Sequence, residues 1–424
     1  MKLDIKNLLQ DKFVLGTFFL TATNFVGAFF TYLVHPILTR HLSIAEYGDF
    51  QTLLSFSTII GIISAVVTTT LIKEFSLLSS INPEGVSVLR RRALSRLFFV
   101  GLFILAGIVI FSQVLNNLFK ISEPAVLIIS SLGLLYIFPM MVNRATLTGK
   151  QAFSALALNN LLDTSGRLLL VILLVIVFPW GLVGASYSFA FAGLIAFVVG
   201  FWQVKKLKLA QSITESKPLL RTMWRYALIV LWFTALYQFF YNFDMLVVKY
   251  FFSPDEAGLY GALLTIGRII YFIGGSVPLV MFPVLASLQN DNSLRRYKVL
   301  GKSLALMSVL TLPTYFVIAV FPEFVIKIIV GVKYLSIAEY LPSFALAMLF
   351  LTLLTVLSQY FLALAKQRGL VVLTIVAIIE VVLLLLFHNN ILEIIRSLTF
   401  VFGSGSMAMI ILLVIDFFKA RRIA

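Results

Sequence analysis

Residues 241–272 read YNFDMLVVKYFFSPDEAGLYGALLTIGRIIYF, two apolar segments joined by a short acidic turn. The turn at residues 253–260 matches residues 43–50 in the pattern S-x-x-E-x-G-x-aromatic. Leucine and isoleucine pairs that follow the two motifs also correspond at this offset of 210 residues. Because the offset is about half of the 424 residues, it indicates an internal duplication, with a first half at residues 1–208 and a second at residues 209–424.

The composition is that of a membrane protein. Hydrophobic residues make up 61% of the chain, charged residues make up 12%, and the mean hydropathy is +1.04, whereas a soluble domain is about half apolar and about a quarter charged. The net charge of +15 is spread between apolar runs without a basic aromatic module, which argues against nucleic acid as a partner. The chain has no cysteine, which excludes disulfides, thiolate zinc sites and cysteine nucleophiles.

Twelve apolar segments are each long enough to cross about 30 Å of hydrocarbon as a helix. The first is too long for the apolar core of a signal peptide, so we expect it to be retained. A short basic lead precedes it, and a polar, lysine-rich joint at residues 205–225 separates the two halves. The predicted spans lie near residues 13–38, 48–72, 94–115, 125–147, 159–179, 182–204, 226–252, 258–283, 299–321, 342–364, 370–388 and 393–418.

The distribution of Lys and Arg over the predicted loops gives the orientation. Loops on the side of the N-terminus carry 25 of these residues, and the opposite loops carry five. We therefore predict an all-α polytopic membrane protein with both termini in the cytoplasm and two parallel six-helix lobes. In transporters of this kind the site lies between the lobes. Arg96, Arg144, Lys302 and Arg396 lie toward the ends of predicted spans and are counted with the loops, which leaves Arg167, Lys249 and Arg268 as the basic residues inside spans.

Polar side chains recur at helical spacing in three of the spans. Hydroxyl side chains serve either close helix packing or the lining of a cavity, and both interpretations stay open. For Asn24 and Gln51 we favour a cavity, because an amide that faces lipid would leave its polar groups unpaired. The polar faces comprise Thr17, Thr21, Asn24, Thr31 and His35 in the first span, Gln51, Ser55, Thr58, Ser64 and Thr68 in the second, and Thr234, Tyr237, Tyr241 and Asp244 in the seventh.

Charged residues inside spans are candidates for the transport pathway, because an ionisable group at the bilayer centre costs about 2.5 kcal/mol or more. Arg268 lies deep in its span and presents a fixed fork suited to phosphate oxygens, which makes it the first candidate to bind an anion. The alternative is a structural ion pair with Asp244 of the neighbouring helix. Lys249 is a second candidate, with snorkelling to the outer surface as its alternative.

Acidic residues inside spans are candidates for ion coupling. Glu380 stands alone in the run TIVAIIEVVLLLLF, where burial favours the neutral acid and suits reversible protonation. Its alternative is a packing contact with a basic neighbour. Asp244 is the second coupling candidate. Asp163 and Arg167 lie four residues apart, and we expect them to pair with each other.

No enzyme signature occurs in the chain. The three histidines are isolated near predicted outer helix ends, so we expect them to be interface residues rather than metal ligands. The motifs of ATPases, zinc enzymes and serine hydrolases are absent from the sequence. We therefore expect no catalytic residue, no cofactor and no metal.

Five stretches spread along the chain carry a family resemblance: PILTRHLSIAEYGDF (36–50), NRATLTGKQAFSALALNNLLDTSGRLLL (143–170), FDMLVVKYFFSPDEAGLYGALLTIGRI (243–269), MFPVLA (281–286) and GVKYLSIAEYLPSFALA (331–347). In them the chain resembles oligosaccharide flippases of the polysaccharide-transport family, within the multidrug/oligosaccharidyl-lipid/polysaccharide exporter superfamily. The resemblance implies two lobes around a central cavity built mainly from the first two helices of each lobe. It also implies alternating access that moves a polyprenyl-diphosphate-linked oligosaccharide across the cytoplasmic membrane for surface polysaccharide, that is O-antigen, capsule or exopolysaccharide.

The resemblance makes Arg268 the best candidate for a diphosphate ligand. Arg40 and Lys249 are expected to receive the diphosphate after the conformational switch. The complete predicted cavity lining is Arg268, Asn24, Arg40, Gln51, Tyr241, Asp244 and Lys249. The expected partners are the lipid-linked oligosaccharide and membrane lipid, and a polysaccharide polymerase complex is a candidate partner. A monomer is the simplest expectation, because two lobes supply both sides of a cavity.

Two alternatives remain. Multidrug exporters of the same superfamily have twelve helices and use membrane acids for cation coupling, a role open to Asp244 and Glu380. A membrane polymerase or ligase that acts on the same lipid would need a sizeable outer loop, and the longest predicted outer loop, residues 322–341, has only Glu323 and Glu339 as acids. Related lipid II flippases have fourteen helices and a more charged first helix, so a peptidoglycan precursor is a less expected cargo.

Overall fold

The structure is a computed structural model that describes residues 12–81, 83–207, 220–288, 293–364 and 366–423. Every regular element in these ranges is a helix. The basic lead at residues 1–11 and most of the predicted joint, residues 208–219, lie outside the described residues. The chain divides into two compact units, Met1–Ala235 and Leu236–Ala424, which we call unit 1 and unit 2. This division falls inside a continuous helix, α10, and not in the polar joint from which the sequence placed the boundary at residues 208 and 209.

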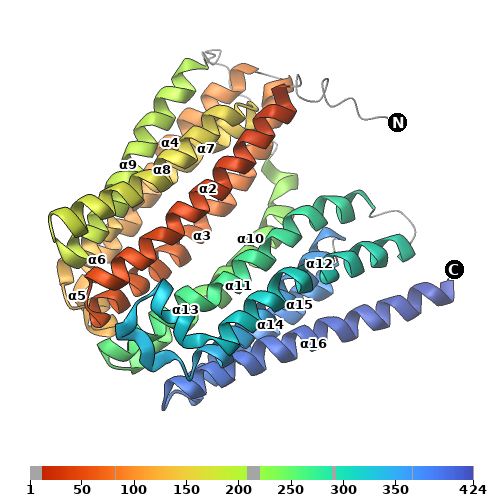
Figure 1. The fold of residues 1–424 in the computed structure, drawn as a ribbon. Helices are drawn as coiled ribbons and strands as arrows, with labels where there is room; N and C mark the ends of the chain where they lie inside the picture. The colour runs from red at the N-terminus through yellow and green to blue at the C-terminus, as the bar shows by residue number, and fades with distance from the viewer. Residues whose placement is uncertain (1–11, 82, 208–219, 289–292, 365, 424) are drawn as a thin grey trace. The chain divides into compact units, whose positions relative to one another are not determined.

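Unit 1 consists of long helices joined by short connections (Figure 1). A separate short helix, α5, follows α4 where the sequence predicted the end of the third span and the start of a connection, and the predicted fourth span is divided into α6 and α7. A π-helical segment continues α8 to Val177. The bounds are α2 (Lys12–His41), α3 (Ile44–Ile81), α4 (Pro83–Ile110), α5 (Ser112–Phe119), α6 (Pro124–Ser131), α7 (Leu134–Gly149), α8 (Phe153–Val171), the π-helical segment (Ile172–Val177) and α9 (Gly181–Lys206).

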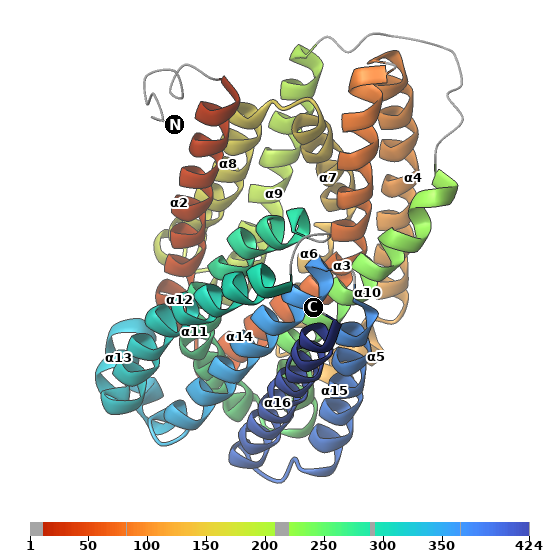
Figure 2. The same ribbon diagram turned by 90° about the vertical axis from the view of Figure 1, so that its right-hand side faces the viewer.

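Unit 2 repeats this order of long helices. Its α14 packs against α11, α12, α15 and α16 (Figure 2). The predicted outer loop at residues 322–341 is a short helix, α13, followed by a 3₁₀ turn. The bounds are α10 (Leu220–Phe251), α11 (Pro254–Ser287), α12 (Ser293–Val320), α13 (Pro322–Ile329), the 3₁₀ segment (Val332–Ile337), α14 (Leu341–Ala363), α15 (Gln367–Leu386) and α16 (Ile391–Ile423).

The two units share one packing pattern. In unit 1, α7 packs on α3, α4 and α9, and α8 packs on α9. In unit 2, α14 packs on α11, α12 and α16, and α15 packs on α16. The helices around α7 and α14 therefore have corresponding neighbours, which is the result expected if a six-helix sequence was duplicated. The extensive contact of α2 with α8 in unit 1 has no counterpart of similar extent between α10 and α15 in the described structure.

The repeated motif is a helix start in both units. The backbone N–H of Ser43 donates to Glu46 Oε2 at 2.7 Å, and the N–H of Glu46 donates to the Ser43 hydroxyl at 3.2 Å. Ser253 and Glu256 form the same reciprocal pair at 3.0 Å and 3.3 Å. This capping box satisfies N–H groups that have no partner inside the helix. The spacing S-x-x-E thus starts α3 and α11, the second long helix of each unit.

Ten helical segments in the described part of the chain are long and apolar enough to cross a membrane. The first and seventh predicted spans coincide with α2 and α10, helices of 30 and 32 residues. The predicted loop between the second and third spans is wrong, because α3 continues to Ile81 and α4 begins at Pro83. A helix of 38 residues such as α3 is about 57 Å long, so it extends well beyond the hydrocarbon and carries its charged end with it.

Glycines allow the long helices to approach closely. A Cβ at Gly101 of α4 would lie 2.3 Å from the backbone oxygen of Leu134 in α7. In unit 2, a Cβ at Gly274 of α11 would lie 2.2 Å from Cγ2 of Thr352 in α14. Both contacts join a helix to the central helix of its unit, α7 or α14. Small residues at helix interfaces are the usual means of close packing in membranes.

Candidate functional site

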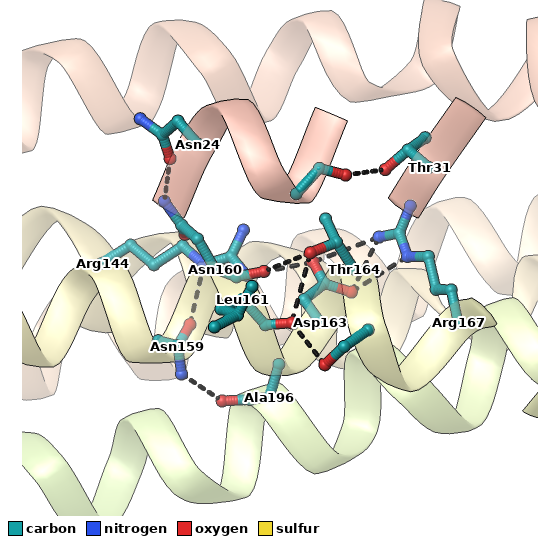
Figure 3. A network of polar contacts seen from close by, with 12 residues as sticks. Asn24, Thr31, Arg144, Asn159, Asn160, Leu161, Asp163, Thr164, Arg167 and Ala196 are labelled. Atoms are coloured by element: carbon teal, nitrogen blue, oxygen red, sulfur yellow. Dashed lines mark hydrogen bonds and ion pairs between the residues drawn. The ribbon is translucent and has the colours of Figure 1, made fainter. Parts of the chain in front are cut away.

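A buried carboxylate in unit 1 lies between two arginines, as Figure 3 shows. Nη2 of Arg144 in α7 lies 3.0 Å from Oδ2 of Asp163 in α8. Nη2 of Arg167, one turn further along α8, lies 2.9 Å from Oδ1 of Asp163. The side chain of Asp163 is 7% exposed, against 16% for Arg144 and 27% for Arg167. One carboxylate neutralises only one of two guanidinium groups, so the cluster keeps one net positive charge.

Asparagine amides connect this cluster to two more helices. Asn159 accepts a hydrogen bond from Nε of Arg144 at 2.9 Å and donates to the backbone oxygen of Ala196 in α9 at 2.7 Å. Asn160 donates to Oδ1 of Asn24 in α2 at 3.2 Å. The network therefore joins α2, α7, α8 and α9 (Figure 3). Asn24 is exposed, and its predicted place in a cavity lining stays a prediction.

The sequence predicted part of this network. Asn159, Asp163 and Arg167 recur every four residues and therefore share one face of α8, and the expected pairing of Asp163 with Arg167 is confirmed. The assignment of Arg144 to a loop is wrong, because α7 runs to Gly149 and carries Arg144 inside the unit. The available signal was an isolated basic residue beside Asn143 within the apolar run of the fourth span.

Predicted charges of unit 2 also lie together. Nη2 of Arg268 in α11 is 4.0 Å from Oδ1 of Asp244 in α10, so the ion pair named as the alternative to anion binding is present. The guanidinium carbon lies 3.9 Å from the ring centroid of Tyr241, and Nη2 donates to the backbone oxygen of the same residue. The side chains of Arg268 and Asp244 are 9% and 2% exposed. Three contacts with α10 thus hold Arg268 inside the unit.

Asp244 has two hydrogen-bond donors besides its ion pair. The hydroxyl of Tyr260 donates to Oδ2 at 2.8 Å, and the backbone N–H of Met245 donates to Oδ1 at 2.8 Å. Tyr260 is fully buried and is the aromatic residue that ends the repeated motif. The sequence analysis gave Tyr260 no functional role. The two copies of the motif did offer a signal, because Tyr260 carries a hydroxyl that its counterpart Phe50 lacks.

Glu380 of α15 is fully buried, and neither carboxyl oxygen has a hydrogen-bond partner within the described residues. It lies within electrostatic range of Asp244 and Tyr260. No described basic residue forms an ion pair with it, so the alternative of a basic packing partner finds no support in the described ranges. Its role in ion coupling stays a prediction.

Three other predicted cavity residues differ in their surroundings. Lys249 is 1% exposed inside α10, which does not fit the alternative that it snorkels to the surface. Arg40 is exposed near the end of α2, where Nη1 donates to the backbone oxygen of Pro36 at 2.8 Å. Gln51 is 1% exposed and donates to the Tyr47 hydroxyl at 2.8 Å. The binding roles of all three stay predictions.

The hydroxyls on the predicted polar faces favour the packing interpretation. Thr31, Thr58 and Ser64 each donate to a backbone oxygen of their own helix, at 2.9, 2.7 and 2.6 Å. Such a bond satisfies the hydroxyl inside its own helix. These side chains therefore need neither a ligand nor water to satisfy their hydrogen-bond donors.

The histidines contact neighbouring groups in the chain. Nδ1 of His35 lies 3.0 Å from the Tyr47 hydroxyl, Nδ1 of His41 lies 2.9 Å from the backbone oxygen of Ile37, and the His388 ring stacks on Phe251. Across the described ranges, no group of three or more His, Asp or Glu side chains is arranged to hold a metal.

The fold defines the class of protein. It is similar to an inward-facing multidrug resistance MATE family transporter of the MOP superfamily, with a TM-score of 0.76 and 13% identity over 90% of this chain and 93% of that one. It is also similar to the lipid II flippase MurJ in an inward closed conformation, with a TM-score of 0.70 and 14% identity over 95% of this chain and 89% of MurJ. A third similar structure is a MOP superfamily transporter from Pyrococcus furiosus, with a TM-score of 0.61 and 14% identity over 94% and 93% of the two chains. The chain is thus a multi-pass, all-helical membrane protein with a fold that transporters share.

A family model gives the narrower assignment. The model of the polysaccharide biosynthesis proteins matches residues 37–339, more than half of the chain. The chain belongs to this family. No curated protein matches the sequence. The matched range contains the repeated motifs of both units and every charged residue of the two clusters except Glu380.

Proposed function

We propose that this protein is a flippase that moves a polyprenyl-diphosphate-linked oligosaccharide from the inner to the outer leaflet of the cytoplasmic membrane, for surface polysaccharide such as O-antigen, capsule or exopolysaccharide. The observation that carries the proposal is the presence of buried guanidinium groups in membrane-spanning helices of a polysaccharide biosynthesis family member. Arginine at membrane depth is costly, and its planar fork matches phosphate oxygens. A similar fold in a lipid II flippase is consistent with a lipid-linked cargo.

The main energetic barrier to flipping is the transfer of the charged, hydrophilic head group across the hydrocarbon. Moving a diphosphate with its sugars through hydrocarbon would cost tens of kcal/mol by Born estimates, so the protein must supply a wet, basic path while the lipid tail stays outside. Arg268 serves as a diphosphate ligand by exchanging its contact with Asp244, 4.0 Å away, for a phosphate oxygen. Arg40 and Lys249 then receive the head group on the outer side.

The driving force has two candidate sources. With the cytoplasm negative, outward movement of an anion is favoured by about 2.3 kcal/mol per charge per 100 mV. Glu380 is a fully buried carboxyl without a hydrogen-bond partner in the described ranges, and it suits a proton that is taken up and released during the cycle. In this proposal both termini are cytoplasmic, and a monomer suffices because one chain supplies both units.

A multidrug exporter is the second candidate function. Similarity to MATE transporters favours it, and so does Glu380, which is buried without a hydrogen-bond partner among the described residues, since membrane acids suit coupling to cations. Accumulation of a fluorescent cationic dye in cells separates the two functions. An exporter lowers dye accumulation in a manner that depends on Glu380, whereas the proposed flippase leaves it unchanged.

Deletion of the gene in its native host tests the proposal. We expect loss of surface polysaccharide and accumulation of complete lipid-linked repeat units on the cytoplasmic leaflet. The wild-type gene and Arg396→Ala, an exposed arginine outside both clusters, restore the polymer, whereas Arg268→Ala does not. Normal surface polysaccharide and no accumulated lipid, in a host without a redundant flippase, overturn the proposal.

A further inference from the structure

The cluster formed by Arg144, Asp163 and Arg167 in unit 1 has more hydrogen-bond donors than its own acceptors use. We propose that it is a second anion-binding site, which takes phosphoryl oxygens of a diphosphate through Arg167, with Arg144 as a positioning residue. The identity of the lipid that carries this diphosphate rests on the proposed function. The proposal places a binding site for the diphosphate in unit 1. The sequence analysis gave Arg144 no role there and expected Arg167 only to pair with Asp163.

Arg167 retains donors for a ligand. A guanidinium group has five N–H donors, and Arg167 uses Nε and Nη2 on Asp163, at 3.0 and 3.2 Å. Its Nη1 makes no hydrogen bond within the described residues, and Figure 3 shows this nitrogen without a contact. With 27% of its side chain exposed, Arg167 is the most accessible member of the cluster. It therefore combines a fixed orientation with free donors on an accessible side.

The surroundings of Arg167 fix its orientation. Asp163 holds the guanidinium from one side through two oxygens, and the ring of Phe189 lies 5.1 Å from its carbon atom. Arg144 is held by Asn159 and Asp163, so it is a second cation that contacts the same carboxylate. Because Asp163 already binds two cations, the cluster does not suit a metal ion or a proton. Its one net positive charge, in surroundings of low dielectric constant, attracts an anion.

Two amides extend the polar surface next to the arginines. Asn160 lies seven residues before Arg167, so both project from the same side of α8. It contacts Asn24 of α2 at 3.2 Å, and Asn24 is exposed. Seven residues of helix rise about 10.5 Å, so these amides offer donors and acceptors to a group beyond the phosphoryl oxygens at Arg167, such as a sugar hydroxyl. The phosphoryl oxygens themselves fall to the arginine fork, whose geometry they match.

Binding of diphosphates to the purified full-length protein in detergent tests the site. The probes are undecaprenyl diphosphate without sugar and inorganic diphosphate, titrated by microscale thermophoresis. Arg167→Gln is expected to weaken binding of the lipid probe about tenfold or more. Arg396→Gln makes the same change at an exposed arginine of α16 and should bind as the wild type does. Thermal unfolding of each variant shows whether it is folded.

A second variant keeps the test decisive if Arg167→Gln does not fold. Asn160→Asp leaves both arginines in place but cancels the net positive charge, so it should weaken binding of the diphosphate about tenfold as well. If inorganic diphosphate competes with the lipid probe, the site recognises phosphoryl oxygens alone. If only the lipid probe binds, in an Arg167-dependent manner, the site recognises the diphosphate as part of the lipid.

The inference and the proposed function fail in different ways. Wild-type affinity in folded Arg167→Gln and folded Asn160→Asp overturns the second site, and the deletion phenotype still decides the flippase. If the wild-type protein binds neither diphosphate, the inference fails together with the substrate class proposed for the flippase.

Discussion

Unit 1 and unit 2 have the same helix packing but different buried charges. In the unit 1 cluster the charges lie on α7 and α8, and two arginines share Asp163. In the unit 2 cluster they lie on α10, α11 and α15, where Arg268 pairs with Asp244 and the second acid, Glu380, has no hydrogen-bond partner in the described ranges. Guanidinium groups therefore outnumber acids in the unit 1 cluster, and acids outnumber the guanidinium group in the unit 2 cluster. The unit 1 cluster suits an anion, and the unit 2 cluster suits an anion at its arginine and a proton at its second acid.

Corresponding positions show how the difference arose. At the offset of 210 residues, Val34, Phe50 and Thr58 of unit 1 stand where unit 2 has Asp244, Tyr260 and Arg268. Packing requires only that side chains of suitable size fill the space between helices. Charge at membrane depth is costly and requires a specific partner. A duplicated fold therefore retains its packing while the two copies acquire separate sets of charges.

The largest expected effect is the loss of the shared carboxylate in unit 1. Asp163→Asn leaves two guanidinium groups without a counter-ion, and breaking a buried pair costs about 3 to 5 kcal/mol. Denaturation in bicelles measures the free energy of unfolding. Asp416→Asn is the matched control, because Asp416 also binds two cations, Lys366 at 2.6 Å and Arg368 at 3.5 Å, but near the surface. If both variants lose the same stability, burial does not distinguish the unit 1 cluster.

A smaller effect is expected in unit 2 from loss of the hydroxyl that contacts Asp244. Tyr260→Phe removes a buried hydrogen bond to a charged group, worth about 1.5 to 3 kcal/mol. The same unfolding measurement checks this value. Tyr187→Phe serves as the control, since the Tyr187 ring stacks on Phe191 and has no hydrogen bond in the described structure. An unchanged stability of Tyr260→Phe would show that Asp244 is satisfied without this residue.

Substitutions in the two capping boxes test whether the two units are stabilised in the same way at the repeated motif. Ser43→Ala and Ser253→Ala each remove one member of a capping box and should each cost about 1 kcal/mol. The two motifs share the reciprocal backbone N–H bonds, and Ser253 also donates its hydroxyl to Glu256 Oε2 at 2.7 Å, so the loss at Ser253 should be at least as large as the loss at Ser43. A cost confined to one unit would show that the repeated motif contributes to the start of only one helix.

The smallest effect on stability is expected at Glu380. Glu380→Gln should change the free energy of unfolding by less than about 1 kcal/mol, because the Glu380 carboxyl has no hydrogen-bond partner among the described residues that the substitution would remove. Its effect should appear in transport: flipping in proteoliposomes loses its response to a proton gradient and retains its response to membrane potential. A wild-type response to the proton gradient in this variant excludes Glu380 as the coupling group.

Local patterns made several features predictable. Asp163 and Arg167 are four residues apart on one helix, so their pairing follows from helical spacing alone. Asp244 and Arg268 lie on consecutive helices joined by a short turn, which places them near each other. Arg144 was missed because a basic residue near the end of an apolar run resembles a loop residue. Only the packing of α7 against its neighbours shows that it is inside.

The sequence by itself determined the membrane class, the duplication, the helical segments and most of the charged residues inside them. These depend on hydrophobicity and on periodicity along the chain, which are local properties. The tertiary structure alone decided which buried polar groups share a partner. It shows that Arg144 joins Asp163, that Tyr260 donates to Asp244, and that Glu380 is buried without a hydrogen bond to any described residue. Such contacts join helices that are distant in sequence, and their geometry depends on packing that no short stretch of the chain encodes.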